Sequence, residues 1–103
     1  MSYNTCMFYG QIKQKKTSES KTGIPMLFFI LKTWDGANET NKYELLDCVA
    51  YDRNAELINR DFEVGDMIIL DCQAHSFKKD EVKLTSFTVR KFSYLAGKNN
   101  GNI

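Results

Sequence analysis

The sequence predicts an all-β fold, a five-stranded Greek-key barrel with one short helix between the third and fourth strands. The main signal is alternation, because apolar and polar residues take turns over several stretches that Gly, Asn and Asp residues separate, as in strands joined by turns. One such stretch, Leu45–Tyr51, passes directly into a helical pattern from Arg53, and further alternating stretches follow it. A helix in that place favours a small closed barrel over a crossover enzyme fold.

The first two strands are predicted at Tyr3–Ile12 and Pro25–Trp34, with the polar segment Gln11–Gly23 as the loop between them. In the first strand, Met7 and Tyr9 lie on the side opposite the residues assigned to the core. Exposed apolar side chains usually mark contacts, so these two residues predict a homo-oligomer, either a dimer or a tetramer. The second strand is apolar on both sides, which is typical of a barrel strand that is covered on its outer face.

A loop is expected at Asp35–Asn41, and the third strand and the helix follow it. Alternation assigns one side of this strand to the core, namely Leu46, Cys48 and Ala50. Asp52 is predicted to cap the helix, because its carboxylate can accept hydrogen bonds from the free N–H groups of a helix that begins at Arg53. The apolar side of the helix is predicted to consist of Ala55, Ile58 and Phe62.

The last two strands are predicted at Met67–Phe77 and Val82–Leu95, joined by a short turn at Lys78–Glu81. The core side of the fourth strand is predicted to be Ile68, Leu70, Cys72 and Ala74. The alternation in the fifth strand slips between Val89 and Phe92, which predicts a bulge there. Residues 97–103 are rich in Gly and Asn and are expected to form a disordered tail, so a single domain spans residues 1–96.

Nothing in the sequence favours a membrane protein, a secreted protein or an enzyme. The longest apolar run, Ile24–Leu31, is far shorter than the ~20 residues that cross a bilayer, and the N-terminus lacks the pattern of a signal peptide, so a cytoplasmic protein is expected. The cysteines Cys6, Cys48 and Cys72 are widely spaced and the only histidine is His75, so no metal site is predicted. Catalysis, a cofactor and a small-molecule substrate are not expected either, because no nucleophile and base are paired and no Gly-rich phosphate loop is present.

The formal net charge of +1 conceals a segregation of charge along the chain. Residues 1–32 carry five lysines against one glutamate, for +4, and residues 73–103 carry six basic residues against two acidic ones, also for +4. Residues 33–72 carry three basic residues against ten acidic ones, for −7. A mixed surface charge is usually only solvated, but most of these lysines fall in predicted loops, and the aromatic share of 13% is high.

The segment Cys48–Glu56 resembles the strand and helix of the bacterial and phage single-stranded DNA-binding proteins. The family pattern there is cysteine, valine, any residue, aromatic, any residue, basic, any residue, Ala-Glu. Further along, Val64–Asp66 is similar to the Lys-Gly turn of this family, and Thr85–Leu95 is similar to its closing strand. The resemblance covers Tyr3–Leu95 and implies an OB-fold, a Greek-key barrel whose loops flank a nucleic-acid-binding face.

Within that resemblance, aromatic rings beside lysines predict a face for single-stranded DNA, because bases stack on aromatic rings and phosphates attract positive charge. The stacking candidates are Trp34, Tyr51 and Phe77. The phosphate candidates are Lys13, Lys15, Lys16 and Lys21 on the first loop, and Lys78, Lys79 and Lys83 at the last hairpin. Each has an alternative interpretation, since an aromatic ring can pack in the core and a lysine can simply solubilise the surface.

Two positions and the end of the chain depart from the family pattern. Leu45 stands where many members carry an aromatic residue, and Asp47 lies on the expected DNA face where a basic or neutral residue is common. Both departures predict weaker binding. The chain also lacks the acidic, hydrophobic tip of the bacterial members, so a phage or plasmid origin is expected.

The sequence therefore predicts a non-enzymatic, sequence-independent single-stranded DNA-binding protein that coats and protects exposed strands during replication or recombination. Asp47 and the acidic middle segment favour an alternative, an OB-fold accessory of a replication or recombination complex that binds protein and touches nucleic acid weakly or never. RNA is a further alternative, because stacking alone does not distinguish the 2′-hydroxyl.

Overall fold

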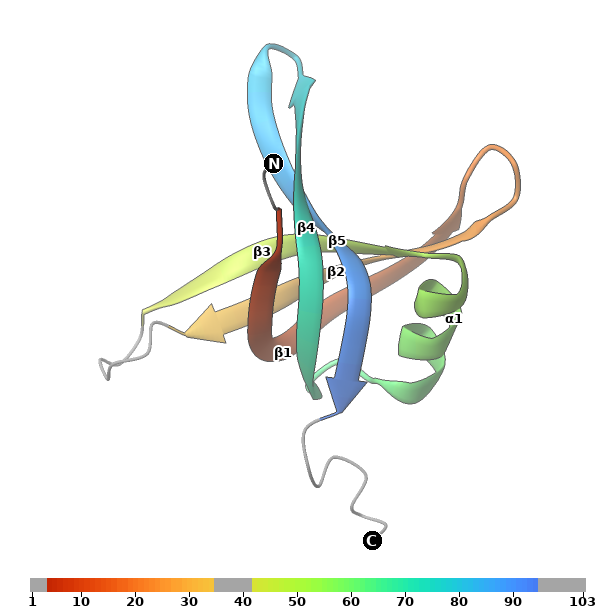
Figure 1. Ribbon diagram of the computed structural model, residues 1–103, viewed down its shortest axis with the longest axis vertical. Coiled ribbons are helices and arrows are strands. Elements are labelled where there is room, and N and C mark those ends of the chain that lie inside the picture. The colour runs from red at the N-terminus through yellow and green to blue at the C-terminus, as the bar shows by residue number, and fades with distance from the viewer. Residues whose placement is uncertain (1–3, 35–41, 95–103) are drawn as a thin grey trace, which may run out of the picture.

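The computed structural model describes residues 4–34 and 42–94, which form a closed barrel of five strands with one helix (Figure 1). The elements are β1 (Cys6–Glu19), β2 (Pro25–Trp34), β3 (Tyr43–Tyr51), α1 (Asp52–Asp61), β4 (Met67–Lys79) and β5 (Val82–Tyr94). Around the barrel the strands follow the order β1-β2-β3-β5-β4, and β4 closes the barrel by pairing with β1. This arrangement confirms the predicted OB-fold. The loop predicted at Asp35–Asn41 and the tail predicted at residues 97–103 lie outside the described residues.

Strand β1 is longer than predicted, and the prediction of a loop over Gln11–Gly23 is wrong. The first half of β1, up to Gln11, pairs with β4, and the second half pairs with β2 as far as Glu19. A bulge between Ile12 and Gln14 separates the two halves. The second half is polar because it forms a hairpin with β2 that projects from the barrel (Figure 1, orange) and has no core beneath it, while β2 satisfies its backbone groups.

The core confirms most of the alternation that was predicted for the strands, although Ala74 of β4 is only half-buried and lies outside the core. The buried strand residues that form it are Ile12, Leu27, Phe29, Leu31, Cys48, Ala50, Ile68, Leu70, Cys72 and Val89. Leu46 packs against this core as predicted, whereas Val49, assigned to the outer side of β3, is also buried. Since alternate residues of each strand face inward, the remaining residues of the same strands form an outward face.

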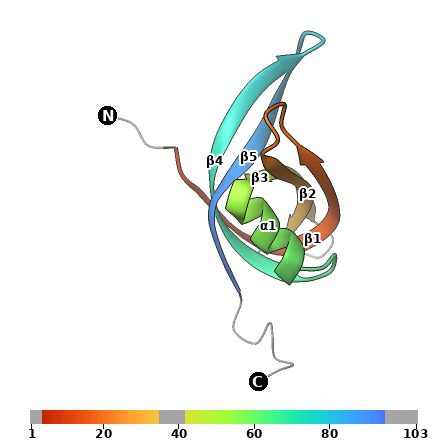
Figure 2. The ribbon, with the colours of Figure 1, turned by 90° about the vertical axis from the view of Figure 1, so that its right-hand side faces the viewer.

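Helix α1 closes one end of the barrel (Figure 2), and it buries Ala55 and Ile58 as predicted, with Phe62 buried just beyond its end. The predicted cap is wrong, because α1 begins at Asp52 itself and no side chain caps it. Asp52 has a φ of 54°, a left-handed conformation that aspartate tolerates better than most residues. A capping residue has an extended backbone, and here that position belongs to Tyr51, which carries no carboxylate.

Strands β4 and β5 form a long hairpin that projects from the barrel at the top of Figure 1. Its turn is Asp80–Glu81, where both residues have a positive φ, of 54° and 73°, as in the tight turns that match the twist of a hairpin. Strand β4 consequently continues to Lys79. The turn is therefore shorter than the predicted Lys78–Glu81.

Strand β5 carries the bulge that was predicted between Val89 and Phe92. On β4, the adjacent residues Asp71 and Cys72 pair with Lys91 and Val89 of β5, so Arg90 is the extra residue. The bulge bends β5 within the barrel wall, between Val89 and Phe92, which both contribute to the core.

Candidate nucleic-acid interface

The outward side chains of β1, β2 and β3 form one continuous face whose rows are set by the strand register. One row consists of Lys16, Phe28 and Val49, and the next consists of Gln14, Ile30 and Asp47. Consecutive rows are two residues apart along each strand, which is about 7 Å. The face continues onto β5, which runs parallel to β3, and from there onto β4.

A groove of about 490 Å³ lies on this face and is lined from both projecting hairpins. Phe28 and Tyr51 line it from β2 and β3, and Phe77 lines it from β4. Phe28 and Phe77 are each 42% exposed and Tyr51 is 44% exposed, so each ring is anchored on the protein but still open to a ligand. Polar side chains at the same groove are Gln14, Lys15, Lys16, Asp47, His75 and Ser86.

Trp34 lies outside this groove, at the other end of the β2–β3 face. Its partner across the strands is Tyr43, and both side chains are exposed. The ammonium nitrogen of Lys32 lies 5.2 Å from the centroid of the Trp34 ring and 4.4 Å from that of the Tyr43 ring, within the range of a cation–π interaction. The face therefore has a second aromatic site, separate from the groove that holds Tyr51 and Phe77.

Sequence reasoning did not select Phe28, Lys32 or Tyr43 for this face. Phe28 and Lys32 could have been found by alternation, since they share the outward side of β2 with Trp34. Tyr43 could not, because its position beside Trp34 depends on the register between β2 and β3.

The lysines predicted to contact phosphate lie on the two projecting hairpins, where most of them are exposed. Those on β1–β2 are Lys13, Lys16 and Lys21, and those on β4–β5 are Lys78, Lys79 and Lys83. Lys16 also lines the groove. Lys78 and Lys83 lie directly opposite each other across β4 and β5, an arrangement of like charges that destabilises a hairpin unless an anion lies nearby.

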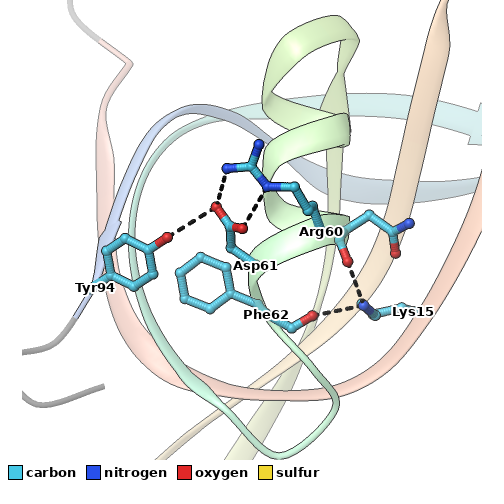
Figure 3. A network of polar contacts seen from close by, with 6 residues as sticks. Lys15, Arg60, Asp61, Phe62 and Tyr94 are labelled. Carbon is cyan, nitrogen blue, oxygen red and sulfur yellow. Dashed lines mark hydrogen bonds and ion pairs between the residues drawn. The ribbon is translucent and has the colours of Figure 1, made fainter. Parts of the chain in front are cut away.

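Lys15 is the exception among the predicted lysines. Its ammonium group donates hydrogen bonds of 3.2 Å to the carbonyl oxygen of Asn59 and 2.7 Å to that of Phe62 (Figure 3). Carbonyl groups at the end of a helix lack hydrogen-bond donors within the helix. Lys15 supplies the donor for two of them and so connects α1 to β1. The structure therefore directs this charge toward the helix, although the side chain borders the groove.

A polar cluster joins α1 to β5 beside this contact. The carboxylate of Asp61 accepts hydrogen bonds of 2.6 and 2.8 Å from the guanidinium of Arg60 and one of 3.0 Å from the hydroxyl of Tyr94 (Figure 3). The hydrogen bond to Asp61 raises the pKa of Arg60. The pKa of Tyr94 is raised mainly by desolvation and, to a smaller extent, by its hydrogen bond to the Asp61 carboxylate. The Tyr94 ring stacks on that of Phe62, with centroids 5.0 Å apart. None of these side chains lines the groove, so their role is to fasten the helix.

The cysteines behave as apolar residues of the core. Burial raises the pKa of the Cys48 thiol, and it raises that of Cys72 to about 12, so both thiols stay neutral. Over residues 4–34 and 42–94, no group of three or more His, Cys, Asp or Glu side chains could hold a metal ion. The same part of the chain contains no helix long and apolar enough to span a membrane.

No protein-family model matches this sequence, and no curated protein matches it. Among solved structures, the chain is similar to the SSB domain of a protein from Synechococcus sp., with a TM-score of 0.73 and a sequence identity of 16%. The match covers 91% of this chain and 98% of that one. At this identity the similarity establishes the fold, and the chain has the five-stranded OB-fold barrel of an SSB domain, with its single helix between β3 and β4.

Proposed function

We propose that this protein binds single-stranded DNA without requiring a particular sequence, and that it coats and protects exposed strands during replication or recombination of a phage or plasmid. The observation that carries the proposal is the groove in which Phe28, Tyr51 and Phe77 stay partly exposed between two lysine-bearing hairpins. The similarity in fold to an SSB domain supports it. On this proposal the protein acts in the cytoplasm as a binding protein and not as an enzyme.

The aromatic rings suit a ligand whose bases are unpaired. Each base that stacks on an aromatic side chain contributes about 1 to 3 kcal/mol, and every base has a flat face to offer. Tyr51 and Tyr43 lie at opposite ends of β3, roughly 27 Å apart at the rise of a strand. A strand that follows the β2–β3 face would first fill the groove and then reach Trp34 beside Tyr43.

The exposed lysines suit the phosphates of the same strand. Lys16 stands beside Phe28 in the groove, so a phosphate there would be next to a stacked base. The pairing of Lys78 with Lys83 places two positive charges side by side, and a bound phosphate would remove their repulsion. Duplex DNA should bind less well, since its bases are already stacked and cannot reach the rings.

The direct test is fluorescence anisotropy of a labelled oligo(dT) strand, with a duplex of the same length and an oligo(U) strand as comparisons. Trp34 is the only tryptophan, so its intrinsic fluorescence gives a second readout. The proposal expects tight binding of the single DNA strand, quenching of Trp34 by a long strand and weak binding of the duplex. Equal affinity for single strand and duplex, or no binding of either, would favour the accessory that binds protein.

We further propose that copies of this chain associate through the outer face of β1 and β4, as a dimer or within a tetramer. Met7 and Tyr9 are 63% and 49% exposed there, and they lie opposite Asp71 and Ile69 of β4. Exposed apolar side chains of this kind usually mark contacts, and a second copy would cover them.

Light scattering tests the association. Replacing Met7 and Tyr9 with charged residues should lower the measured mass, whereas the control Val64→Glu, at another exposed apolar position, should leave it unchanged. A wild-type protein that runs as a monomer of 11.9 kDa at micromolar concentration would contradict the proposal.

A further inference from the structure

The groove contains a carboxylate, Asp47, in the middle of the face that is otherwise suited to DNA. Asp47 is exposed and points outward from β3, opposite Ile30 of β2. Among the described residues that line the groove, it is the only acidic one. No hydrogen bond or ion pair engages its side chain within the described part of the chain. Both oxygens of Asp47 are therefore available to a ligand.

The neighbours of Asp47 determine what such a ligand presents to it. Phe28 lies in the next row toward Tyr51, about 7 Å along the sheet, and Phe77 lines the same groove from β4. A base stacked on Phe28 is about as wide as one row spacing, so its edge would reach the row that contains Asp47. The phosphates would stay near the lysines, because a carboxylate repels them.

An ionised carboxylate only accepts hydrogen bonds, so it selects among bases by the donors on their edges. On its Watson–Crick edge, guanine presents two adjacent donors, N1–H and the N2 amino group, which match the two oxygens of a carboxylate. Cytosine and adenine each present one amino group. Thymine presents a single N3–H between two carbonyl oxygens, which repel a carboxylate.

We infer that Asp47 reads the edge of a base stacked in the groove, and that the protein prefers strands containing guanine over strands of thymine alone. The inference rests on the proposed function and adds a bias among bases to it. The Asp47 carboxylate weakens the binding of phosphates, but it can accept hydrogen bonds from the N–H groups on the edge of a base. Gln14, His75 and Ser86 line the groove as well, but each of them can both donate and accept hydrogen bonds, so Asp47 is the acceptor-only group among these polar neighbours.

The test compares three strands of equal length by fluorescence anisotropy. One is oligo(dT), the second carries isolated guanines among the thymines, and the third carries hypoxanthine in their place, which keeps N1–H but lacks the amino group. The wild-type protein should bind the guanine strand at least about five-fold more tightly than oligo(dT), the lower end of discrimination by a two-bond contact. The hypoxanthine strand should fall between them.

Two variants of Asp47 test the inference, because removing the carboxylate should change the affinity for oligo(dT) and the preference for guanine in different ways. Asp47→Asn should bind oligo(dT) more tightly, because a negative charge is removed, and it should lose most of the preference for guanine. Asp47→Ala should lose the preference as well. The control Glu44→Gln neutralises another carboxylate of β3, one that lies on the alternate side of the strand and does not line the groove, and it should keep the preference.

Each outcome has a separate meaning. If the wild-type protein binds oligo(dT) as tightly as the guanine strand, or if Asp47→Ala keeps the preference, the inference is wrong and the proposed function stands. If none of the three strands binds, the proposed function and the inference are both overturned.

Discussion

The ammonium group of Lys15 on β1 donates a 2.7 Å hydrogen bond to the carbonyl oxygen of Phe62, directly after α1. The adjacent Lys16 points to the other side of β1, where it lines the groove beside Phe28. Two neighbouring lysines that look equivalent in the sequence therefore have different roles. One fastens the helix, and the other faces the proposed DNA site.

This difference can be measured with a matched pair of variants. Lys15→Met should lower the free energy of unfolding by about 1 to 3 kcal/mol, because it removes a charged donor from carbonyl groups that then lack a partner. It should leave the affinity of the folded protein for oligo(dT) unchanged. Lys16→Met should leave stability unchanged and weaken DNA binding. Chemical denaturation and anisotropy distinguish the two, and equal losses of affinity in both variants would contradict the assignment.

The separation of Trp34 from the groove predicts a dependence on strand length. Tyr51→Ala and Phe77→Ala should each weaken binding of a short oligo(dT) by about 1 to 3 kcal/mol. Trp34→Ala should have that effect only on strands long enough to leave the groove and reach the far end of β2. Titrations with a short and a long strand test this, with circular dichroism to verify the fold.

The control for these aromatic variants is Val64→Ala, which truncates an exposed apolar residue outside the groove. It should leave both affinities unchanged. If Trp34→Ala and Tyr51→Ala leave the affinity for both strands unchanged while the fold is intact, neither ring stacks on a base.

Alternation could predict most of this fold because burial in a barrel repeats every second residue. Pro25–Trp34 was predicted with the bounds that β2 has, and the slip in β5 was predicted where the extra residue Arg90 lies. The second half of β1 was missed, since its residues are polar and face no core. A hairpin that projects into solvent is stabilised mainly by its backbone ladder, and residue polarity does not reveal it.

The candidate site was less predictable, because it depends on register and on strand length. Alternation could place Tyr51 outward, but the β2–β3 register is what sets Trp34 beside Tyr43 and away from the groove. Lys15 was expected on the loop between the first two strands. It lies on a strand whose inner side faces the end of α1, a contact between segments far apart in the sequence.

The close packing around Gly10 predicts that adding a single methyl group at this position lowers the stability of the fold. A Cβ atom at this position of β1 would lie 2.5 Å from the backbone oxygen of Lys32 and 2.9 Å from the Cγ atom of Leu31. Gly10→Ala should therefore lower the free energy of unfolding by about 1 to 3 kcal/mol, the usual cost of overpacking. The control Ser18→Ala lies on the exposed half of β1 and should change little. A Gly10→Ala protein as resistant to denaturant as the wild type would show that β1 and β2 can move apart at low cost.

The charge on the two hairpins predicts how binding responds to salt. Each phosphate neutralised on a single strand contributes about −0.7 to the slope of log affinity against log salt, because condensed counterions are released. With Lys15 engaged by α1, at most the six other predicted lysines reach phosphates, so a slope between roughly −2 and −4 per subunit is expected, which corresponds to about three to six phosphates. Anisotropy titrations of oligo(dT) over a range of salt concentrations measure it.

Charge neutralisation then identifies the side chains responsible. The variant combines four changes to glutamine, at Lys13, Lys16, Lys78 and Lys79. It should flatten the slope and weaken binding to all sequences alike, since phosphates carry no sequence information. The control Arg53→Gln removes an exposed charge on α1 that does not line the groove, and it should keep the wild-type slope. A slope that is unchanged in the fourfold variant, or that falls equally in the control, would mean that these lysines are ordinary surface charge and that the affinity for DNA arises elsewhere.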